Sequence, residues 1–405
     1  MVINNKTYIY MLMYIFSILI PMEAYFNVGN VRVELYRILL LLVTPYVFIN
    51  LNKNKLIGLK EKLLFVFCIY VGVSFYINHG FVKIESGIIN FLEVFIGYGL
   101  GLLLLGDKNI FKNVFKVFLI VFLTLIPFAV YEAIDGVRFL HIIAADIFGN
   151  PVVEELGDSY FRHGIHRAST LFSHPILYSI CGVMLFPILF IYFRPLKAVV
   201  MGAGILVAMI TSVTSAGFLM IAFQFSLYLL KRLSFYIDKI YKIIFITMIL
   251  LYVFLVISSN RGPILILIQT LALNPATAYA RYQQWQFSID DISSNPFFGI
   301  GFHNWSRPFW MSSSVDSFWL NTTLISGYPS LILLLSFFFL SLKEHWSKKD
   351  NKSNGHYHFA FFCSISSILF AGLTVDFFDR AQLMVFFIMG IYNSFLLNLN
   401  KETKK

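Results

Sequence analysis

Long apolar runs separated by short polar segments extend along the whole chain. A helix that crosses a membrane needs about twenty mostly apolar residues, and runs near this length recur throughout the sequence. The predicted spans are twelve segments at residues 8–22, 35–51, 63–79, 87–105, 117–134, 175–193, 198–213, 215–230, 242–258, 318–341, 358–373 and 381–398. The pattern predicts an all-α polytopic membrane protein of about twelve transmembrane helices, with residues 1–405 forming a single transmembrane domain.

The composition indicates the same class of protein. Hydrophobic residues make up 58% of the chain and charged residues 13%, whereas charged residues reach about a quarter of a soluble globular protein. The spans leave no room for a sizeable soluble domain. The three cysteines lie far apart in separate apolar runs, which is typical of core residues and not of a disulfide framework.

Lysine and arginine are distributed unequally among the polar connections. Lysines concentrate in the connections 52–62, 106–116, 231–242 and 343–352 and in the tail 401–405. Because basic residues are enriched on the cytoplasmic side of membrane proteins, we predict that these segments and both termini are cytoplasmic. Orientation then accounts for the net charge of +10, and no nucleic-acid partner is expected.

The connections on the opposite side carry arginine instead. The basic residues predicted on this outer face are Arg32, Arg37, Lys83, Arg138, Arg162, Arg167, Arg261, Arg281, Arg307 and Arg380. A guanidinium presents a planar fork that binds phosphate or carboxylate through two parallel hydrogen bonds, which an ammonium group cannot do. The arginine bias therefore predicts an outer face that binds an anion.

Two of the predicted outer loops are long, at residues 135–174 and 258–317. Within the second loop, a helix predicted over Ala280–Ser294 places Tyr282, Trp285, Ile289 and Ile292 on one face. A helix of this kind is expected to lie in the plane of the membrane interface.

The first outer loop ends in the basic stretch RHGIHRASTLFSHP, directly before the sixth predicted span. Arg162 and Arg167 in this stretch can together neutralise a diphosphate and bind its oxygens by charge-assisted hydrogen bonds. The alternative is that both arginines reach toward lipid headgroups. We expect diphosphate binding, because the outer leaflet presents less anionic lipid than the cytoplasmic one.

The same stretch contains His163, His166 and His174. We regard His166 and His174 as candidate substrate-binding residues, and the alternative is that they are hydrogen-bonded surface groups. The spacing of the histidines matches no zinc signature, and no cysteine or clear acidic ligand accompanies them, so no metal is expected.

The second outer loop supplies further candidates. Arg281 is a candidate catalytic residue. Arg261, His303 and Arg307 are candidate substrate-binding residues in the same loop. Asp316 lies where the loop re-enters the membrane, beside an apolar span that would raise its pKa and make it a usable base. Asp316 also stands where a carboxylate caps the following helix, and the two roles are compatible.

Two further groups of charged residues lie at or inside predicted spans. Glu93 lies within the fourth span, where a charge is costly enough to mark a candidate substrate-binding residue. The alternative is an ion pair with Arg37 that holds helices together. Asp376, Asp379 and Arg380 form the last outer turn, where we expect the charges to pair with one another.

Three stretches carry a family resemblance. RASTLFSHP, at Arg167–Pro175, combines an arginine, small residues, Thr-Leu-Phe and a His-Pro step that begins a span. RYQQWQFSIDDISSNPFFGIG, at Arg281–Gly301, combines an arginine, a tryptophan, Asn-Pro and Gly-x-Gly, and Asp316-Ser317 is followed after nine residues by Gly327. In this order the patterns resemble the bacterial O-antigen polymerase and ligase superfamily, membrane glycosyltransferases that use undecaprenyl-diphosphate-linked sugars.

The resemblance implies a metal-independent transfer without a cofactor at the outer face of the bacterial plasma membrane. The donor would be a glycan on undecaprenyl diphosphate, and the acceptor a sugar hydroxyl of a new lipid-linked repeat. Arg167 and Arg281 would hold the diphosphate, with Arg162 next in importance, and Asp316 would accept the hydroxyl proton. The expected partners are these lipid-linked glycans, membrane lipid, a chain-length regulator and a flippase.

The sequence departs from the family pattern at two places. Asp316 stands where the ligases have a histidine, which favours a polymerase of O-antigen or capsular polysaccharide over a ligase. Thr214-Ser215-Ala216-Gly217 lacks the arginine of the family's serine-arginine step, so a contact made by some relatives is missing or moved.

Three other functions compete with polymerisation. A ligase would transfer the finished polymer to another acceptor. A flippase for lipid-linked oligosaccharides is expected to have short loops, an internal repeat and charges between its helices. This sequence has no visible repeat, and its charges gather in two unequal outer loops. A structural membrane protein would have no use for the arginine bias.

Overall fold

The structure, a computed structural model, describes residues 5–29, 31–152, 160–237, 239–258, 275–350 and 354–402. This part of the chain is mostly helical, and a helix or a pair of successive helices lies over each predicted span. These helices are α1 (Asn5–Ile18), α2 (Leu35–Lys53), α3 (Leu59–His79), α4 (Ile84–Phe91) with α5 (Gly97–Leu102), α6 (Lys108–Thr124) with α7 (Ile126–Asp135), α9 (Pro175–Tyr192), α10 (Pro195–Ser212), α11 (Ser215–Leu233), α12 (Ile240–Ser258), α15 (Phe318–Ser347), α16 (Gly355–Ala371) and α17 (Asp379–Glu402).

The helices make this a membrane-embedded, all-α protein. Within the described residues, eight helical segments are long and apolar enough to cross a membrane. One of the eight, Leu59–Leu102, turns at the 3₁₀-helix η1 (Gly80–Lys83) and contains α3 as well as α4 and α5. The helices α1, α12 and α16 lie over predicted spans but outside this set, since α1 and α16 have only 14 and 17 residues. The number of crossings therefore stays a prediction.

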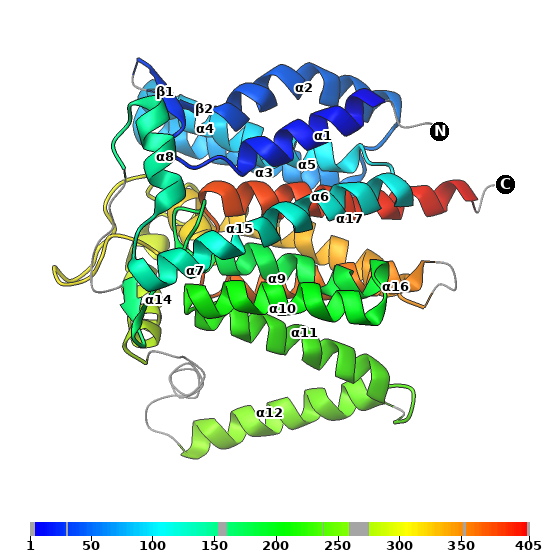
Figure 1. Ribbon diagram of the computed structural model, residues 1–405. Helices are drawn as coiled ribbons and strands as arrows, with labels where there is room; N and C mark the ends of the chain where they lie inside the picture. The colour runs from blue at the N-terminus through cyan, green and yellow to red at the C-terminus, as the bar shows by residue number, and fades with distance from the viewer. Residues whose placement is uncertain are drawn as a thin grey trace.

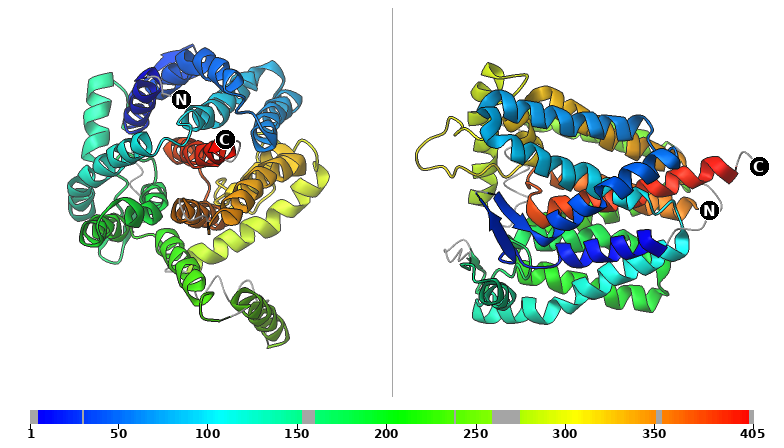
Figure 2. Two further views of the ribbon diagram at one scale, coloured as in Figure 1. Left: turned by 90° about the vertical axis from the view of Figure 1, so that its right-hand side faces the viewer. Right: turned by 90° about the horizontal axis from the view of Figure 1, so that it is seen from above.

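Most of the helices pack side by side in a bundle with two distinct ends, and α12 stands apart from the bundle, beyond α11 (Figure 1). The start of α1 and the end of α17 lie at one end, which we call the terminus end. The other end, the loop end, carries the hairpin β1 (Tyr25–Val28) and β2 (Val31–Glu34), the short helix α8 (Phe139–Phe148) and α14 (Pro275–Ser294). The central helix, α17, is surrounded by the others (Figure 2).

Proline explains a break in one predicted span. The segment predicted over 117–134 is two helices, because α6 ends at Thr124 and α7 begins at Ile126, just before Pro127. Proline has no backbone N–H and fits best in the first turn of a helix, so the helix is interrupted at Leu125 and restarts just before Pro127. Pro45 in α2 and Pro187 in α9, by contrast, lie inside continuous helices.

Two helices lie across the bundle axis at the loop end (Figures 1 and 2). The first, α14, contains the predicted helix Ala280–Ser294 and begins five residues earlier, at Pro275. Its Trp285 and Ile289 are exposed, as expected for an apolar face turned to lipid. Ile292 of the same predicted face is instead buried in a small core with Trp305, so the prediction was wrong for this residue. The second, α8, is not one of the predicted helices, and its exposed Ile143 and Ile147 give it a similar apolar face.

The N-terminal hairpin is tied to α17 by charge. Arg380 is 2% exposed and donates from Nη2 to Glu34 at 2.7 Å and to the carbonyl of Ile20 at 3.0 Å. Arg380 also pairs with Asp379, as predicted for the last outer turn. Asp376, the third residue of that prediction, takes no part in these ion pairs and lies in a different environment.

Candidate functional site

A short hairpin positions Arg162. The strands β3 (Phe161–Arg162) and β4 (Ile165–His166) pair antiparallel, so that Arg162 lies opposite Ile165. The two residues between them, His163 and Gly164, have φ values of 52° and 83°. Left-handed backbone at both positions is typical of a tight two-residue hairpin turn, and glycine adopts it without steric cost.

Arg167, directly after this hairpin, is held on both sides. Its backbone N–H donates to the carbonyl of Tyr160 at 2.7 Å, and the next N–H, that of Ala168, donates to Thr211 at 2.9 Å. The Arg167 side chain is 3% exposed, and its Nε donates to the carbonyl of Ser212 at 3.2 Å. These contacts fix the guanidinium against the end of α10.

The turn after Arg167 is held by one buried carboxylate. Glu132, near the end of α7, accepts hydrogen bonds from the backbone N–H and hydroxyl of Ser169, both at 3.0 Å, and from the N–H of Thr170 at 2.9 Å. Arg138 Nε lies 3.8 Å from the same carboxylate. A carboxylate that accepts several backbone N–H groups holds a turn strongly, so Glu132 is a positioning residue for Arg167.

The second outer loop brings Arg281 and Asp316 together. Arg281 on α14 donates from Nε to Asp316 Oδ2 at 3.2 Å. Gln284, one turn further along α14, accepts from the backbone N–H of Asp316 at 2.9 Å and donates to the carbonyl of Ser314 at 3.1 Å. The neutral side chain of Gln284, on the same helix as Arg281, therefore holds Asp316 in place for the ion pair.

The glycines of the family resemblance lie where the segment Pro296–Gly301 packs against the backbone of α15. Gly327 breaks α15 with φ 78° and ψ 175°, and a side chain there would place its Cβ 2.0 Å from the carbonyl oxygen of Phe297. The break leaves carbonyls of α15 without helical partners, and Leu324 accepts from the N–H of Ile300 at 2.8 Å. Gly299 has φ 60°, and its Cβ would meet the same Leu324 oxygen. Only glycine fits at these two positions.

Two neighbouring cavities lie among these elements. The larger, of about 900 Å³, is lined by residues of the second outer loop and of the α16–α17 connection, and the smaller has about 170 Å³. The two cavities share His174, Ile176, Arg281 and Asp316 in their walls. The smaller cavity adds Arg162 and Arg167. The predicted residues Arg162, Arg167, Arg281, His174 and Asp316 therefore converge on one place.

Helix starts add positive charge to the smaller cavity. Ile176, in the first turn of α9, and Ser215 and Ala216, in the first turn of α11, line it. The N–H groups of a first helical turn carry a partial positive charge and suit an anion. The segment Thr214–Gly217, which lacks the arginine of the family pattern, thus presents a helix start to the same cavity.

The arginines of the smaller cavity lie close enough to repel one another. Burial, with the charges of Arg162 and Arg281, lowers the pKa of Arg167 to about 10. Burial and the charge of Arg281 also lower the pKa of Arg162. Each arginine stays protonated near neutral pH, and a bound dianion would relieve the repulsion among them.

His174 is neutral in this environment. Burial, with the charges of Arg167, Arg281, Arg162 and Arg138, lowers the pKa of His174 to about 3. Its Nδ1 accepts the N–H of Ile176 at 3.2 Å and caps α9. The proton of the neutral ring is therefore on Nε2, where it can donate to a ligand oxygen.

Asp376 is a site residue that the sequence analysis assigned to ion pairing. It lines the larger cavity and accepts a hydrogen bond from Asn321 Nδ2 at 2.8 Å. Burial raises the pKa of Asp376 to about 7, the bond from Asn321 opposes this shift, and the charge of Asp316 adds to it. A carboxyl group that titrates near neutral pH beside another carboxylate is typical of acid–base sites. Its position next to Asp379 and Arg380 in sequence concealed this environment.

The remaining predicted residues are dispersed. His303 lines the larger cavity. His166 packs its ring against Phe161, outside the residues that line either cavity, and Arg307 donates to carbonyls of its own loop at Trp305 and Met311. Arg261 lies outside the described residues.

Glu93 lies in the helix bundle and forms the ion pair with Arg37 that was the alternative to a substrate-binding role. It accepts hydrogen bonds from Arg37 Nε at 2.9 Å and from the Tyr36 hydroxyl at 3.0 Å. This ion pair links α2 to the π-helix η2 (Leu92–Ile96), which joins α4 to α5. Any contact of Glu93 with substrate stays a prediction.

The described residues contain no group of three or more His, Cys, Asp or Glu side chains placed to hold a metal ion. The arrangement at the loop end is a cluster of three arginines beside a larger cavity lined by two carboxyl groups. Neither the known protein-family models nor the curated proteins match this chain.

Proposed function

We propose that the protein is a membrane glycosyltransferase that polymerises undecaprenyl-diphosphate-linked oligosaccharide repeats into O-antigen or capsular polysaccharide. The observation that carries the proposal is the convergence of Arg162, Arg167 and Arg281 on one cavity, which adjoins a larger cavity lined by Asp316 and Asp376. Three guanidinium groups suit the charge of a diphosphate. The larger cavity has room for sugar units next to it.

The reaction is a substitution at the anomeric carbon of the donor sugar. An acceptor hydroxyl oxygen forms the new bond to this carbon, and the bond from the carbon to the diphosphate oxygen breaks. Undecaprenyl diphosphate leaves with the electron pair, and the arginines stabilise the negative charge that develops on it. Neutral His174 donates a hydrogen bond from Nε2 to the same group.

The proton of the acceptor hydroxyl passes to a carboxylate in the larger cavity. Asp316 is the first candidate, as expected from the sequence, and its bond to Arg281 couples proton transfer to diphosphate binding. Asp376 is the second candidate, because its pKa of about 7 suits a base that works near neutral pH.

The topology proposed here has twelve crossings, with the terminus end in the cytoplasm and the loop end at the outer face of the bacterial plasma membrane. The connection between α2 and α3, with Lys55, and the segment after α15, with Lys348 and Lys349, carry the lysine expected on the cytoplasmic side. The proposed site then faces the compartment into which a flippase delivers lipid-linked repeats.

Purified protein tests the activity directly. A single synthetic repeat on undecaprenyl diphosphate, supplied as donor and acceptor, should give a ladder of longer glycans and release undecaprenyl diphosphate, with or without EDTA. The proposal would be contradicted if no longer glycans form when the lipid-linked repeat unit of the native polysaccharide is the substrate. Loss of the ladder in EDTA alone would contradict only the metal independence.

Deletion of the gene separates the competing functions. A polymerase mutant should still display single-repeat glycans at the cell surface. Complete loss of surface glycan would indicate a flippase or a ligase instead, and an unchanged chain-length distribution would refute all three functions.

A further inference from the structure

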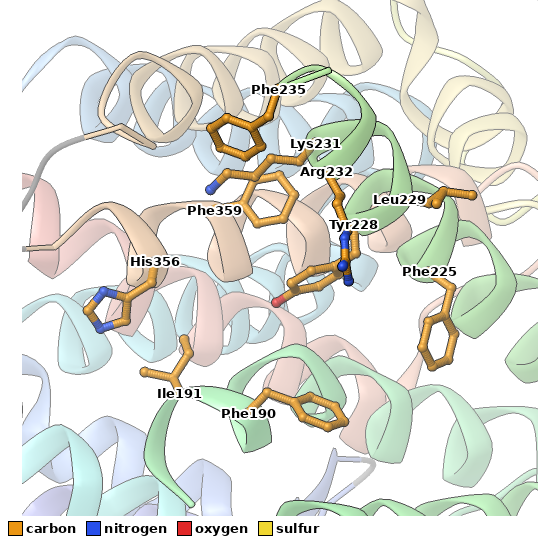
Figure 3. Close-up of a pocket in the computed structure, with 10 residues that line it drawn as sticks. All are labelled: Phe190, Ile191, Phe225, Tyr228, Leu229, Lys231, Arg232, Phe235, His356 and Phe359. Atoms are coloured by element: carbon orange, nitrogen blue, oxygen red, sulfur yellow. The ribbon is translucent and has the colours of Figure 1, made fainter. Parts of the chain in front are cut away.

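A third cavity, of about 700 Å³, lies at the terminus end of the bundle, on the opposite side of the protein from the candidate site. It is formed by the last turns of α9 and α11 and the first turns of α16 (Figure 3). Its walls are mainly aromatic and include Phe190, Phe225, Tyr228 and Phe359. None of these residues belongs to the site proposed for glycan transfer.

The charges in this cavity are basic. The two cations that line it are Lys231 and Arg232, and no aspartate or glutamate among the described residues lines it. His356 also lines it, but burial and the charges of Lys108 and Lys231 lower its pKa, so it adds no charge near neutral pH. The ammonium group of Lys231 lies 4.0 Å from the centroid of the Phe359 ring. The acidic residue that acts on Lys231, Asp350, is itself paired with Lys349 at 3.0 Å. Within the part of the chain that the structure describes, no carboxylate in the cavity wall neutralises Lys231 and Arg232.

The apolar walls continue onto the outer surface of the bundle. Phe225 is 56% exposed and Leu229 is 57% exposed, on the helix face that precedes Lys231 and Arg232. Figure 3 shows the side chains of Lys231 and Arg232 near Tyr228 and Phe359, with Phe190 on a neighbouring helix. Apolar surface thus runs along the helices, and the cations lie at its end.

This geometry matches one class of ligand. The lysine-rich terminus end is predicted to be cytoplasmic, and the cytoplasmic leaflet contains anionic lipids that basic pockets between helices bind. A soluble anion would make no use of the aromatic walls, and a zwitterionic lipid would leave the cluster of cations without net neutralisation.

We propose that this cavity binds an anionic phospholipid of the cytoplasmic leaflet. The lipid phosphate lies between Lys231 and Arg232, and one acyl chain lies along Phe190 and Phe225. The proposal is independent of the glycosyltransferase activity, because it concerns the opposite end of the bundle.

Lipid binding to the purified full-length protein tests this proposal. Native mass spectrometry or a competition assay in detergent would compare phosphatidylglycerol with phosphatidylcholine of the same chains. We expect the protein to prefer phosphatidylglycerol. The double variant Lys231→Gln, Arg232→Gln should weaken the binding of phosphatidylglycerol roughly thirty-fold, since both cations contribute a similar share of the attraction to the lipid phosphate.

Two control variants keep the test decisive. Lys112→Gln, Lys116→Gln removes the same charge from exposed positions of α6 outside the cavity and should retain the affinity. Lys231→Arg, Arg232→Lys keeps the charge and should also retain it. Equal loss in either control, or equal binding of phosphatidylcholine, would overturn the proposal. Competition by glycerol phosphate as strong as by intact lipid would show a headgroup site only and would overturn the role of the aromatic walls.

Discussion

Arg281 and Asp316 form an ion pair, with 3.2 Å between Arg281 Nε and Asp316 Oδ2, in the wall that the two cavities share. The same arginine is thus placed to meet the proposed diphosphate on one side and a carboxylate on the other. Under the proposed function, a diphosphate bound at Arg281 would compete with Asp316 for the guanidinium group. The ion pair would then connect the two cavities, since both of its residues line each of them.

Replacement of the buried arginine by lysine tests the diphosphate contact. Arg167→Lys keeps the charge but loses the planar fork, so we expect polymer formation to fall roughly a hundredfold. Ladder formation by the purified variant measures this effect. The control is Arg32→Lys, because Arg32 pairs with Glu34 and lines neither cavity. Ladder formation by this variant should stay near the wild-type level. If Arg167→Lys makes polymer of normal chain length, the proposal that Arg167 binds the diphosphate is refuted.

The pH dependence tests Asp376. Its pKa is raised to about 7, so the carboxyl is protonated below this pH and charged above it. If Asp376 accepts the hydroxyl proton, the rate should rise with pH and reach half of its maximum near pH 7. Asp376→Asn should lower the rate and remove this rise. A variant that stays slow but keeps the same pH profile would assign the proton to another group, with Asp316 as the first to test.

Glu132→Gln tests the positioning of Arg167. The amide has only one acceptor oxygen and turns an NH₂ group toward backbone N–H donors, so the turn at Ser169 and Thr170 should loosen. We expect roughly a tenfold fall in kcat/KM, mainly through a higher KM for the lipid-linked donor.

Ser169→Ala is the matched control for Glu132→Gln. It removes the hydroxyl bond but keeps the backbone bond to Glu132, so kcat/KM should change less than about threefold. A thermal unfolding midpoint close to wild type would separate positioning from loss of folded protein. An unchanged KM for Glu132→Gln would assign Glu132 to stability alone.

Gly327→Ala tests the break in α15. A Cβ at this position would lie 2.0 Å from Phe297 O, in addition to the backbone strain at φ 78°, so we expect destabilisation by more than about 3 kcal/mol. Gly149→Ala is the control, since Gly149 has φ 68° but no atom within 4 Å of its added Cβ. It should cost about 1 kcal/mol. Equal melting temperatures for the two variants would contradict the packing described at Gly327.

The helices of the fold could be predicted because each is encoded locally. A run of apolar residues forms a helix wherever it meets lipid, and α9, α10 and α15 begin within about three residues of the predicted starts. The short elements at the loop end carry weaker signals. Both β-hairpins were missed, since two-residue and four-residue strands have no periodicity to detect, and α8 is too short for a span.

The candidate site could be predicted only in part. Arg162, Arg167, Arg281, His174 and Asp316 came from residue type and from the family resemblance, and nothing in their spacing required them to meet. The environment of Asp376 depends on Asn321, 55 residues away. Sequence neighbours suggested an ion pair for Asp376, whereas a long-range contact decides its charge.

The break in α15 also has a consequence for biosynthesis. The segment Pro296–Gly301 leaves the ribosome before α15, and its N–H groups at Ile300 and Gly301 find their acceptors only in Leu324 and Ile325. Tyr328 in turn donates to Pro296. The loop and the helix can therefore mature only together. A chain that ends before Tyr328 would leave the carbonyl of Pro296 without this donor.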